Sequence, residues 1–372
     1  MNVRLINTEN KTDVKKFIQM PFDLYRKNPY WVPQMRSDTR FILDRSSYPF
    51  YQHSAADFFI AENSGKTLGR IGVISNSRFN KTNQLKTAFF YFFDSIDDSE
   101  VSNALFIAAF NWARERGHDH VYGPKGLLQG DGIGLLVEGF DQIPAIGISY
   151  NFPYYDKLVK QAGFQKIFDY YSGYLDTTIG LSEKVKRVAE KVKERSGFWV
   201  KKFDSKEDLL AIAPELRQVY NSAFSGSEGF SPITEDEIAL IAKRMLSIAD
   251  PRLIKLVYKE DQIIGFLFSY PNICRGLQKT NGRLFPFGWF HIWREFKTTK
   301  YMDTNGIGIL PEYHGLGSTA VIYTELEKTF REFDFDHVET VQTREDNIAS
   351  LGESGHFSMN WTKTHRVYEI DL

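Results

Sequence analysis

The chain of 372 residues repeats one order of predicted elements, and this repetition constrains its fold more than any single motif. Two apolar segments around a polar turn occur at 58–74 and again at 253–268, and each predicts a β-hairpin. A strand, a helix, a strand, a short helix and a last strand follow in each half. The length also suits two domains, at about 150 residues per domain. We therefore predict two domains of the same fold, residues 1–180 and 181–372.

The other predicted elements occupy matching places in the two halves. In the first half they are a strand at 87–93, a helix at 99–116, a strand at 120–122 and a helical stretch from Asn151 to Phe164. In the second half they are a strand at 301–310, a helix at 318–332, a strand at 337–341 and a helical stretch from Asn347 to Phe357. This order predicts the α/β (α+β) class, with a mixed sheet flanked by helices in each domain. A charged helix at 182–195, with Ser182 as its N-cap, opens the second domain.

A glycine turn in the second half, Pro311–Thr319, follows a predicted strand and precedes a predicted helix. Glycines let the backbone approach a ligand closely, and the first N–H groups of a helix point at an anion. No Gly-Lys-Ser/Thr closes a P-loop here, and no third glycine completes a dinucleotide fingerprint. The strand before the turn carries Gly306 and Gly308, which indicate a bulge or a close approach of another backbone. A ligand lying against that strand would explain both glycines.

This turn resembles the acyl-CoA-binding signature of the GNAT acyltransferases, Gln/Arg-x-x-Gly-x-Gly/Ala, which Pro-Glu-Tyr commonly precedes. Pro311-Glu312-Tyr313 matches, His314 stands at the Gln/Arg position, Gly317 matches the first glycine, and Thr319 replaces the last Gly/Ala. The order of the elements is also that of the GNAT fold, and it covers nearly the whole chain as a tandem pair.

The first half adds two further points of resemblance. Its start, Asn28–Pro33, and its glycine-dense loop, Tyr122–Asp141, look like those of uncharacterised bacterial proteins with two GNAT-like domains. A loop of this kind also occurs as ordinary surface structure in which glycines supply positive φ angles.

The resemblance implies acyl-CoA as a co-substrate, with no metal. The residues that it places at the acyl-CoA are Ile309, Leu310, His314, Gly315, Leu316, Gly317, Ser318, Thr319 and Asn347. The family holds the pyrophosphate chiefly through backbone amides. We expect a backbone N–H of Ile309 or Leu310 to polarise the thioester carbonyl while an amine attacks it.

The resemblance also suggests catalytic residues. Asp303 shares a strand face with Asn305 and lies where some family members carry their basic carboxylate, although an Asp on the solvent side of an edge strand is the alternative. The tyrosine that usually serves as the general acid in this family has no counterpart between Asn347 and Gly355. Tyr323 and Tyr368 are the candidate substitutes.

The first half differs at the place of the glycine turn. Residues 92–100 contain no glycine and gather four carboxylates. Carboxylates suit the start of a helix, with Asp98 or Ser99 as its cap, but they would repel a pyrophosphate. We therefore expect the first domain to contribute shape or acceptor binding and not to bind acyl-CoA.

An aromatic segment, Leu284–Phe296, lies where a plain GNAT domain would have a shorter connection. A helix from Trp289 would align Trp289, Ile292, Trp293 and Phe296 in one stripe. Such a stripe is most often part of a core. The functional alternative is a lid over the acceptor or a groove for an apolar acyl chain, in which Phe287, Trp289 and Trp293 bind substrate. Contact with a membrane surface is the weaker third alternative, because the basic face is sparse.

Composition excludes several classes of protein. A net charge of −1, with basic residues dispersed along the chain, gives no electrostatic case for nucleic acid. The single cysteine, Cys274, excludes an intramolecular disulfide and a cysteine-based zinc site. No signal peptide is visible, and the longest apolar stretch, 104–110, is far shorter than a membrane helix. These features predict a cytoplasmic protein without a transmembrane segment and leave a homodimer open.

Together these features predict an acyltransferase that moves an acyl group from acyl-CoA to an amine, either a small molecule or a lipid amine, bound between the domains. The aromatic segment favours long acyl chains or an apolar acceptor. One alternative is a degenerate GNAT-fold protein that binds ligands or serves as a scaffold without catalysis. Another is a transferase that uses aminoacyl-tRNA, which would need a basic groove.

Overall fold

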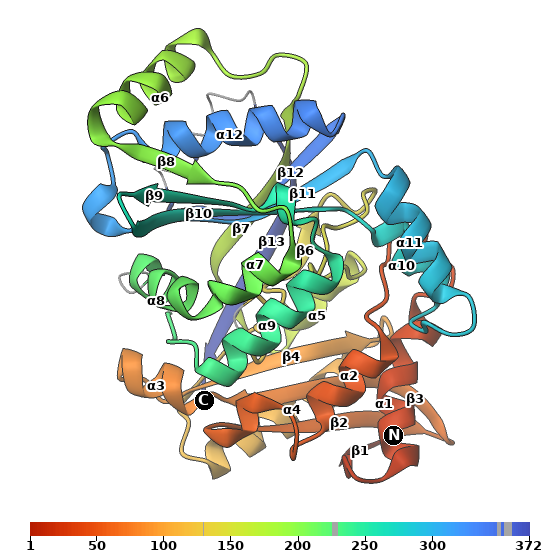
Figure 1. The fold of residues 1–372 in the computed structure, drawn as a ribbon. Coiled ribbons are helices and arrows are strands. Elements are labelled where there is room, and N and C mark those ends of the chain that lie inside the picture. Colours follow the sequence, from red (N-terminus) through yellow and green to blue (C-terminus); the bar gives the residue numbers. More distant parts are fainter. Residues whose placement is uncertain (129, 225–229, 348–350, 353–358) are drawn as a thin grey trace. The chain divides into compact units, whose positions relative to one another are not determined.

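The computed structural model describes residues 1–128, 130–224, 230–347, 351–352 and 359–372. The chain forms two units, shown in Figure 1. Unit 1 consists of Met1–Tyr170, Cys274–Arg294 and Lys363–Leu372, and unit 2 consists of Tyr171–Ile273 and Glu295–Thr362. Two segments from the second half of the sequence therefore pack with the first unit. Most of the helical stretch predicted from Asn347 to Phe357 lies outside the described residues.

The sheet of unit 1 has the strand order β1-β2-β3-β4-β5-β13, and β6 also pairs with β13. All of these pairs are antiparallel except β4–β5, which is parallel. The predicted hairpin is β2–β3, and the chain's last strand lies beside β5. The strands are β1 (Asn2–Leu5), β2 (Ala55–Asn63), β3 (Lys66–Ser75), β4 (Thr87–Ser95), β5 (His120–Gly123), β6 (Leu135–Glu138) and β13 (Asn360–Asp371).

Helices cover both faces of this sheet. Gly69 packs against Leu105 of α4, whereas the guanidinium of the next residue, Arg70, donates to the carbonyl of Phe17 in α1. Because neighbouring strand residues point to opposite faces, α4 and α1 lie on opposite sides. The predicted cap of α4 is confirmed, since the Asp98 carboxylate accepts the N–H of Glu100. The helices of unit 1 are α1 (Lys11–Leu24), α2 (Arg36–Leu43), η1 (Pro49–Gln52), α3 (Ser77–Asn83), α4 (Ser99–Glu115), α5 (Tyr154–Gln161) and α10 (Cys274–Thr280).

The sheet of unit 2 has the order β7-β12-β11-β10-β9-β8. The β11–β12 pair is parallel, and the pairs from β11 to β8 are antiparallel. The second predicted hairpin is β9–β10. The strands are β7 (Gln165–Asp176), β8 (Phe198–Lys201), β9 (Lys255–Lys259), β10 (Gln262–Pro271), β11 (Tyr301–Ile309) and β12 (His337–Arg344).

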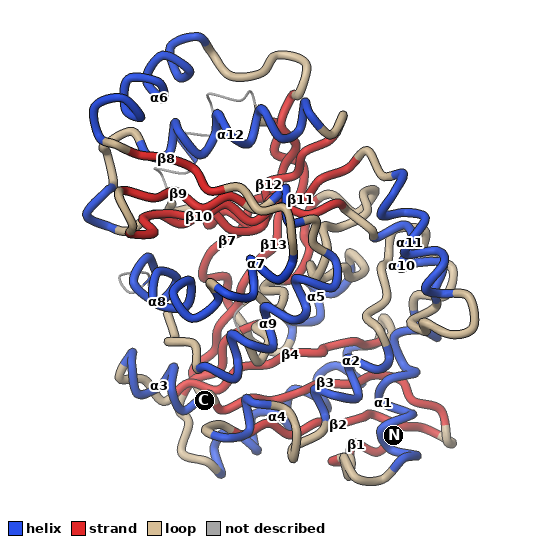
Figure 2. Tube along the Cα trace, viewed as in Figure 1, coloured by secondary structure: helices blue, strands red, loops and turns tan. Residues whose placement is uncertain are grey.

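Helices also cover both faces of the second sheet, and Figure 2 shows the helices and strands of each unit by colour. Gly265 of β10 lies beside Ile322 of α12, while the next residue, Phe266, stacks on Tyr220 of α8. Ser182 caps α6, as predicted, by accepting the N–H of Val185. Each unit is thus a mixed sheet flanked by helices. The helices are α6 (Glu183–Ser196), α7 (Lys206–Ala211), α8 (Ala213–Phe224), α9 (Glu235–Ile248), η2 (Pro251–Leu253), η3 (Pro311–Tyr313) and α12 (Ser318–Glu332), while α11 (Gly288–Thr298) begins in unit 1 and ends in unit 2.

Among the described residues, no helix combines the length and the apolar character that crossing a membrane requires.

The core of unit 1 extends to the end of the chain. Phe90 of β4 contacts Phe106 of α4 edge-to-face, with ring centroids 5.4 Å apart, and Phe164 lies against both rings. Tyr368 of β13 is buried in the same cluster. The last strand therefore contributes to the hydrophobic stabilisation of the first unit.

One residue of β13, His365, makes the stability of unit 1 depend on pH. Its ring is completely buried, its Nε2–H donates to the carbonyl of Ser149 at 3.1 Å, and its Nδ1 has no hydrogen-bond partner among the described residues. Burial lowers the pKa of His365 to about 4. Between pH 6.5 and 4 the unfolded chain therefore binds a proton that the folded chain does not, so acid favours unfolding.

We expect the free energy of unfolding to fall by about 3 kcal/mol between pH 7 and pH 4 through this histidine alone. His365→Gln keeps an N–H donor but removes the titration, so the variant should lose less stability over this range. Urea unfolding at both pH values measures the difference, with His291→Gln as a partly exposed control. Equal pH dependence in wild type and His365→Gln would contradict this assignment.

Candidate functional site

The two parallel strands in the middle of unit 2 separate part-way along their length. The β11–β12 ladder runs from Tyr301 paired with His337 to Thr304 paired with Thr340. Within the described residues it ends there, although β11 continues to Ile309 and β12 to Arg344. Separated strands leave backbone groups at their carboxyl ends open to a ligand, which is where α/β sheets commonly bind one.

The separation coincides with a bulge in β11. The register against β10 shifts between Leu267 paired with Ile307 and Ser269 paired with Thr304. A side chain at Gly308 would collide with the Phe266 ring at 2.3 Å, and one at Gly306 would press on Phe268 at 3.2 Å. The predicted bulge is confirmed. The two glycines make room for aromatic rings of β10, so they do not require the ligand that the sequence suggested.

The glycine turn follows β11, and its two glycines have different surroundings. Both have positive φ angles, 73° at Gly315 and 84° at Gly317. A Cβ atom at Gly317 would lie 2.6 Å from Val192 of α6, so the turn packs tightly against that helix. A Cβ at Gly315 would meet nothing within 4 Å. Gly317 is therefore needed for packing, whereas the space beside Gly315 is open.

The backbone of this turn presents a row of hydrogen-bond donors. In the part of the chain that the structure describes, no acceptor takes the N–H groups of residues 315–319. The first N–H groups of α12 are among them, at the positive end of the helix dipole. The Ser318 hydroxyl is turned back and donates to the carbonyl of Tyr313 at 3.0 Å. Open N–H groups at a helix start suit a phosphate or pyrophosphate.

The end of β11 supplies one further donor. The N–H of Leu310 donates to the carbonyl of Ile264 at 2.9 Å, so Leu310 would have to give up this bond to polarise a ligand carbonyl. Because N–H directions alternate along a strand, the N–H of Ile309 points to the β12 side, where the ladder has ended. The Nε2–H of His314 donates to the carbonyl of Ile309 at 3.0 Å and so holds the imidazole against the strand end.

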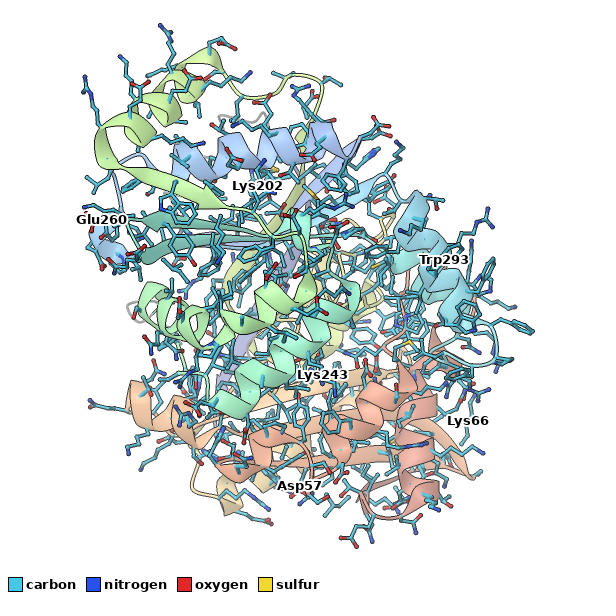
Figure 3. All side chains as sticks on the ribbon, in the orientation of Figure 1. Asp57, Lys66, Lys202, Lys243, Glu260 and Trp293 are labelled. Atoms are coloured by element: carbon cyan, nitrogen blue, oxygen red, sulfur yellow. The ribbon has the colours of Figure 1, made fainter. Side chains whose placement is uncertain are left out.

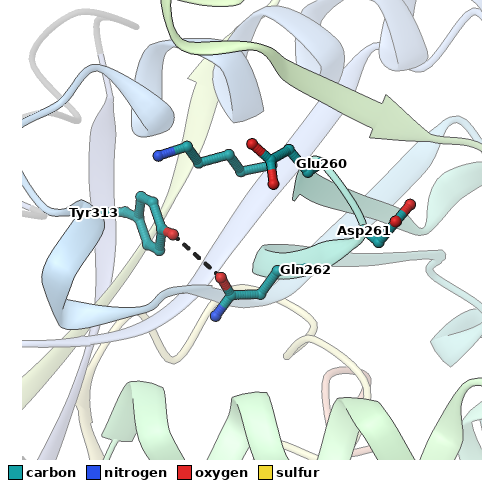
Figure 4. Close-up of a pocket in the computed structure, with 5 residues that line it drawn as sticks. Glu260, Asp261, Gln262 and Tyr313 are labelled. Carbon is teal, nitrogen blue, oxygen red and sulfur yellow. Dashed lines mark hydrogen bonds between the residues drawn. The ribbon is translucent and has the colours of Figure 1, made fainter.

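A pocket of about 560 Å³ lies between the glycine turn and the β9–β10 turn, shown in Figure 4. The Tyr313 hydroxyl donates to Oε1 of Gln262 at 3.2 Å, and the Lys259 ammonium lies 5.5 Å from the Tyr313 ring centroid. The pocket is an open surface depression, not an enclosed cavity. The sequence analysis named Tyr313 but missed the residues from β9 and β10, because a polar hairpin turn carries no specific signal. The lining residues are Lys259, Glu260, Asp261, Gln262 and Tyr313.

A pair of buried carboxylates lies just before the point where the strands separate. Asp303 of β11 and Glu339 of β12 are direct partners in the ladder, so their side chains stand together on one face. Their exposed fractions are 1% and 2%. The side-chain amide of Asn272 donates to both oxygens of Asp303, at 2.9 and 3.1 Å. The alternative of a solvent-side Asp on an edge strand is therefore wrong, because β11 is an interior strand and Asp303 is buried.

Tyr174 of β7 completes this cluster. Its pKa is raised, first by burial and then by the negative charges of Glu339 and Asp303, and its side chain is hydrogen-bonded to Glu339. The rings of Tyr301 and His337, two residues earlier on the same face, stack with centroids 4.3 Å apart. The sequence analysis missed Glu339, Tyr174 and Asn272. A charged residue inside the apolar pattern of β12 was the available signal for Glu339.

The corresponding place in unit 1 has different chemistry. The N–H of Ser95, at the end of β4, donates to the Tyr155 hydroxyl at 3.1 Å, and the Ser95 carbonyl accepts from Tyr154 at 2.8 Å. Asp94 is buried and paired with Arg70 at 2.7 Å. The N–H of Ser95 is thus bound by a side chain, whereas the N–H of Ile309 at the same place in unit 2 is open within the described part of the chain.

The remaining predicted residues lie elsewhere. Tyr323 is half-buried on α12 against the core of unit 2, and Asn347 lies after β12 with its N–H bonded to the carbonyl of Arg344 at 3.0 Å. Tyr368 belongs to unit 1, where its hydroxyl donates to Asp156. The aromatic residues predicted to bind substrate also belong to unit 1 and are exposed, so their stripe is not part of a core: Phe287, Trp289 and Trp293.

Comparison with solved structures agrees with this architecture. A tandem GNAT protein from the clavulanic acid biosynthesis pathway matches with a TM-score of 0.57 at 11% identity, over 100% of this chain and 98% of its own. A GCN5-related N-acetyltransferase from Sphaerobacter thermophilus matches with a TM-score of 0.52 at 11% identity, over 100% and 95%. The chain has the tandem GNAT fold. The fold class predicted from the sequence is confirmed.

Curated relatives share this length. A protein named bacterial ceramide synthase, from Caulobacter vibrioides, is 27% identical over 100% of this chain and 98% of its own length. Protein YghO from Escherichia coli K12 is 28% identical over 98% and 94%. A search against descriptions of protein families finds no match. The open N–H groups of residues 315–319 and the buried carboxylates of Asp303 and Glu339 all belong to unit 2 of this tandem fold.

Proposed function

We propose that the protein is an N-acyltransferase that moves an acyl group from acyl-CoA to the amino group of a long-chain amine. The observation that carries the proposal is the separation of β11 from β12, with open backbone donors after it and a buried carboxylate pair before it. The full-length similarity to a protein named bacterial ceramide synthase supports the acceptor class. A ceramide is the amide of a fatty acid and a long-chain amino alcohol.

The C-terminal half is the acyl-CoA-binding half in this proposal. The N–H groups of residues 315–319 bind the pyrophosphate, and Lys259 in the neighbouring pocket pairs with a further phosphate of the nucleotide. The N–H of Ile309 donates to the thioester carbonyl and stabilises the negative charge that develops there. Unit 1 binds no acyl-CoA, because the N–H of Ser95, which corresponds to Ile309, is already bound by the Tyr155 hydroxyl.

The carboxylate pair acts as the general base that accepts the proton of the attacking amine. The amine nitrogen forms a bond to the thioester carbon, the carbon–sulfur bond breaks, and the nitrogen loses one proton while the thiolate gains one. Two adjacent carboxylates titrate as a pair and can share a single proton, so Asp303 and Glu339 together can accept a proton as the amide forms. Asn272 and Tyr174 orient the pair. Tyr323, in the same unit, remains the candidate that returns a proton to the thiolate.

The test is formation of an amide by the purified protein from palmitoyl-CoA and sphinganine, followed by mass spectrometry and by release of the CoA thiol. We expect Asp303→Asn and Glu339→Gln each to lower kcat by about 10²-fold or more, with a smaller change in KM for the acyl-CoA. Asp57→Asn, a change in a buried carboxylate of unit 1, is the matched control and should retain activity. No amide from any long-chain or short amine would contradict the proposal and favour a GNAT-fold protein that only binds ligands.

The glycine turn is tested separately by binding. Gly315→Gln places a side chain in the open space where the pyrophosphate would lie, and we expect the affinity for CoA in isothermal titration to fall by about 10²-fold. Gly65→Gln is the matched control, because Gly65 also has a positive φ angle, 80°, and open space around its Cβ position. The two variants should therefore lose similar stability, while only Gly315→Gln loses binding. Equal CoA affinity in both would refute the turn as the binding site.

A further inference from the structure

A cluster of exposed aromatic side chains lies on the segment before and within α11. Of the six Phe and Trp side chains that the described residues expose, five fall between 285 and 293. Phe285 is 78% exposed and Trp293 is 54% exposed, and Trp293 is labelled in Figure 3. We call this cluster the aromatic patch: Leu284, Phe285, Phe287, Trp289, Phe290 and Trp293. An exposed apolar cluster of this density marks an interaction surface.

The aromatic patch stands on an ordered base within unit 1. The side-chain amide of Gln278 in α10 donates to the carbonyls of Pro29 and Trp31, at 2.8 and 3.1 Å. The carbonyl of Gly282 accepts the N–H of Arg36 at 2.9 Å, and Gly282 fits closely against the Phe22 ring. These bonds fix both ends of the turn that precedes the patch. The segment that carries the aromatic side chains is therefore fixed to unit 1 by hydrogen bonds, while the side chains themselves are exposed.

The patch itself is also structured. The N–H of Trp289 donates to the carbonyl of Leu284 at 2.9 Å, and its indole Nε1–H donates to the carbonyl of Pro286 at 3.0 Å. Gly288 packs against the carbonyl of Arg283 so closely that a Cβ atom would lie 1.9 Å from it. A rigid apolar surface loses little conformational entropy when it binds a partner. The rigidity of the patch therefore favours association.

Positive charge surrounds the aromatic patch. The segment Cys274–Arg294 contains four basic residues and no acidic residue, so it carries +4. The whole chain carries −1, so all other residues together carry −5. The four basic side chains are exposed: Arg275, Lys279, Arg283 and Arg294. Arg36 lies close enough to Arg283 that its pKa is lowered, first by burial and then by that like charge.

We propose that the aromatic patch and its basic surround dock unit 1 onto the surface of an anionic lipid bilayer. Trp and Phe favour the boundary between head groups and acyl chains, and nearby Arg and Lys side chains pair with anionic head groups. The segment carries +4 and all other residues together carry −5, so an anionic surface attracts the segment and repels the rest of the chain. Docking is independent of acyl transfer, although it would bring the protein to a lipid acceptor.

The test is flotation of the full chain with vesicles, without acyl-CoA or amine. We expect binding to vesicles of phosphatidylglycerol and phosphatidylethanolamine, weaker binding to phosphatidylcholine, and loss of binding as salt screens the basic residues. Trp289→Ser with Trp293→Ser should weaken binding by about tenfold or more. Phe285→Ser with Phe287→Ser should do the same without touching a hydrogen bond of the patch. Lys279→Glu with Arg283→Glu should weaken only the binding to anionic vesicles.

Two control variants distinguish binding through the aromatic patch from nonspecific binding of the protein to vesicles. Trp199→Ser removes the one other exposed tryptophan of the described residues, and Lys66→Glu reverses a charge at the start of β3. Both should bind vesicles as wild type does. Wild-type protein that fails to float with anionic vesicles, or folded patch variants that float equally well, would overturn the proposal. Self-association that the Phe285→Ser/Phe287→Ser variant abolishes, with no vesicle binding, would assign the patch to a second copy of this chain instead.

Discussion

Among the residues that the structure describes, β11 and β12 pair at four positions and then separate, and this separation is the constraint on which the site depends. Had the ladder continued, the N–H groups on that side of β11 would bond to β12 and no donor would face a substrate. The rings of Phe266 and Phe268, packed on Gly308 and Gly306, accompany the bulge at that point. Core packing and ligand binding are thus linked, since the aromatic residues that fill unit 2 also shape the strand that presents the donors.

Burial gives the carboxylate pair its chemical character. Two carboxylates side by side in a sheet cost free energy unless a proton or hydrogen bonds compensate, and Asn272 and Tyr174 supply bonds to them. Such an arrangement persists more readily for a function than for stability, because apolar residues would fill the same positions at lower cost. Unit 1 differs, because the ladder pair that corresponds to the two carboxylates is Phe89 with Tyr122. The buried Asp94 lies beyond that ladder and is neutralised by Arg70.

Local signals in the sequence predicted what depends on local physics. The two hairpins and the caps at Asp98 and Ser182 follow from alternation and capping chemistry, and the tandem GNAT fold was predicted from the resemblance of the glycine turn and the element order to that family. The partners of Asp303 did not, because Glu339 and Tyr174 come from strands that are distant in sequence, and only the register of the sheet brings them together. The aromatic stripe of α11 has the period of a buried helix face, and periodicity alone does not reveal that Trp289 and Trp293 are exposed while Ile292 and Phe296 are half-buried.

The measurement that tests the central claim most directly is amide hydrogen exchange, by NMR, with and without a saturating unreactive acyl-CoA thioether. The account predicts slower exchange at Ile309 and at residues 315–319, with little change at Ser95 and the start of α4 in unit 1. Unchanged exchange at Ile309 and at residues 315–319 in the presence of bound ligand would contradict it. Protection confined to unit 1 would move the donor site to the other half of the chain.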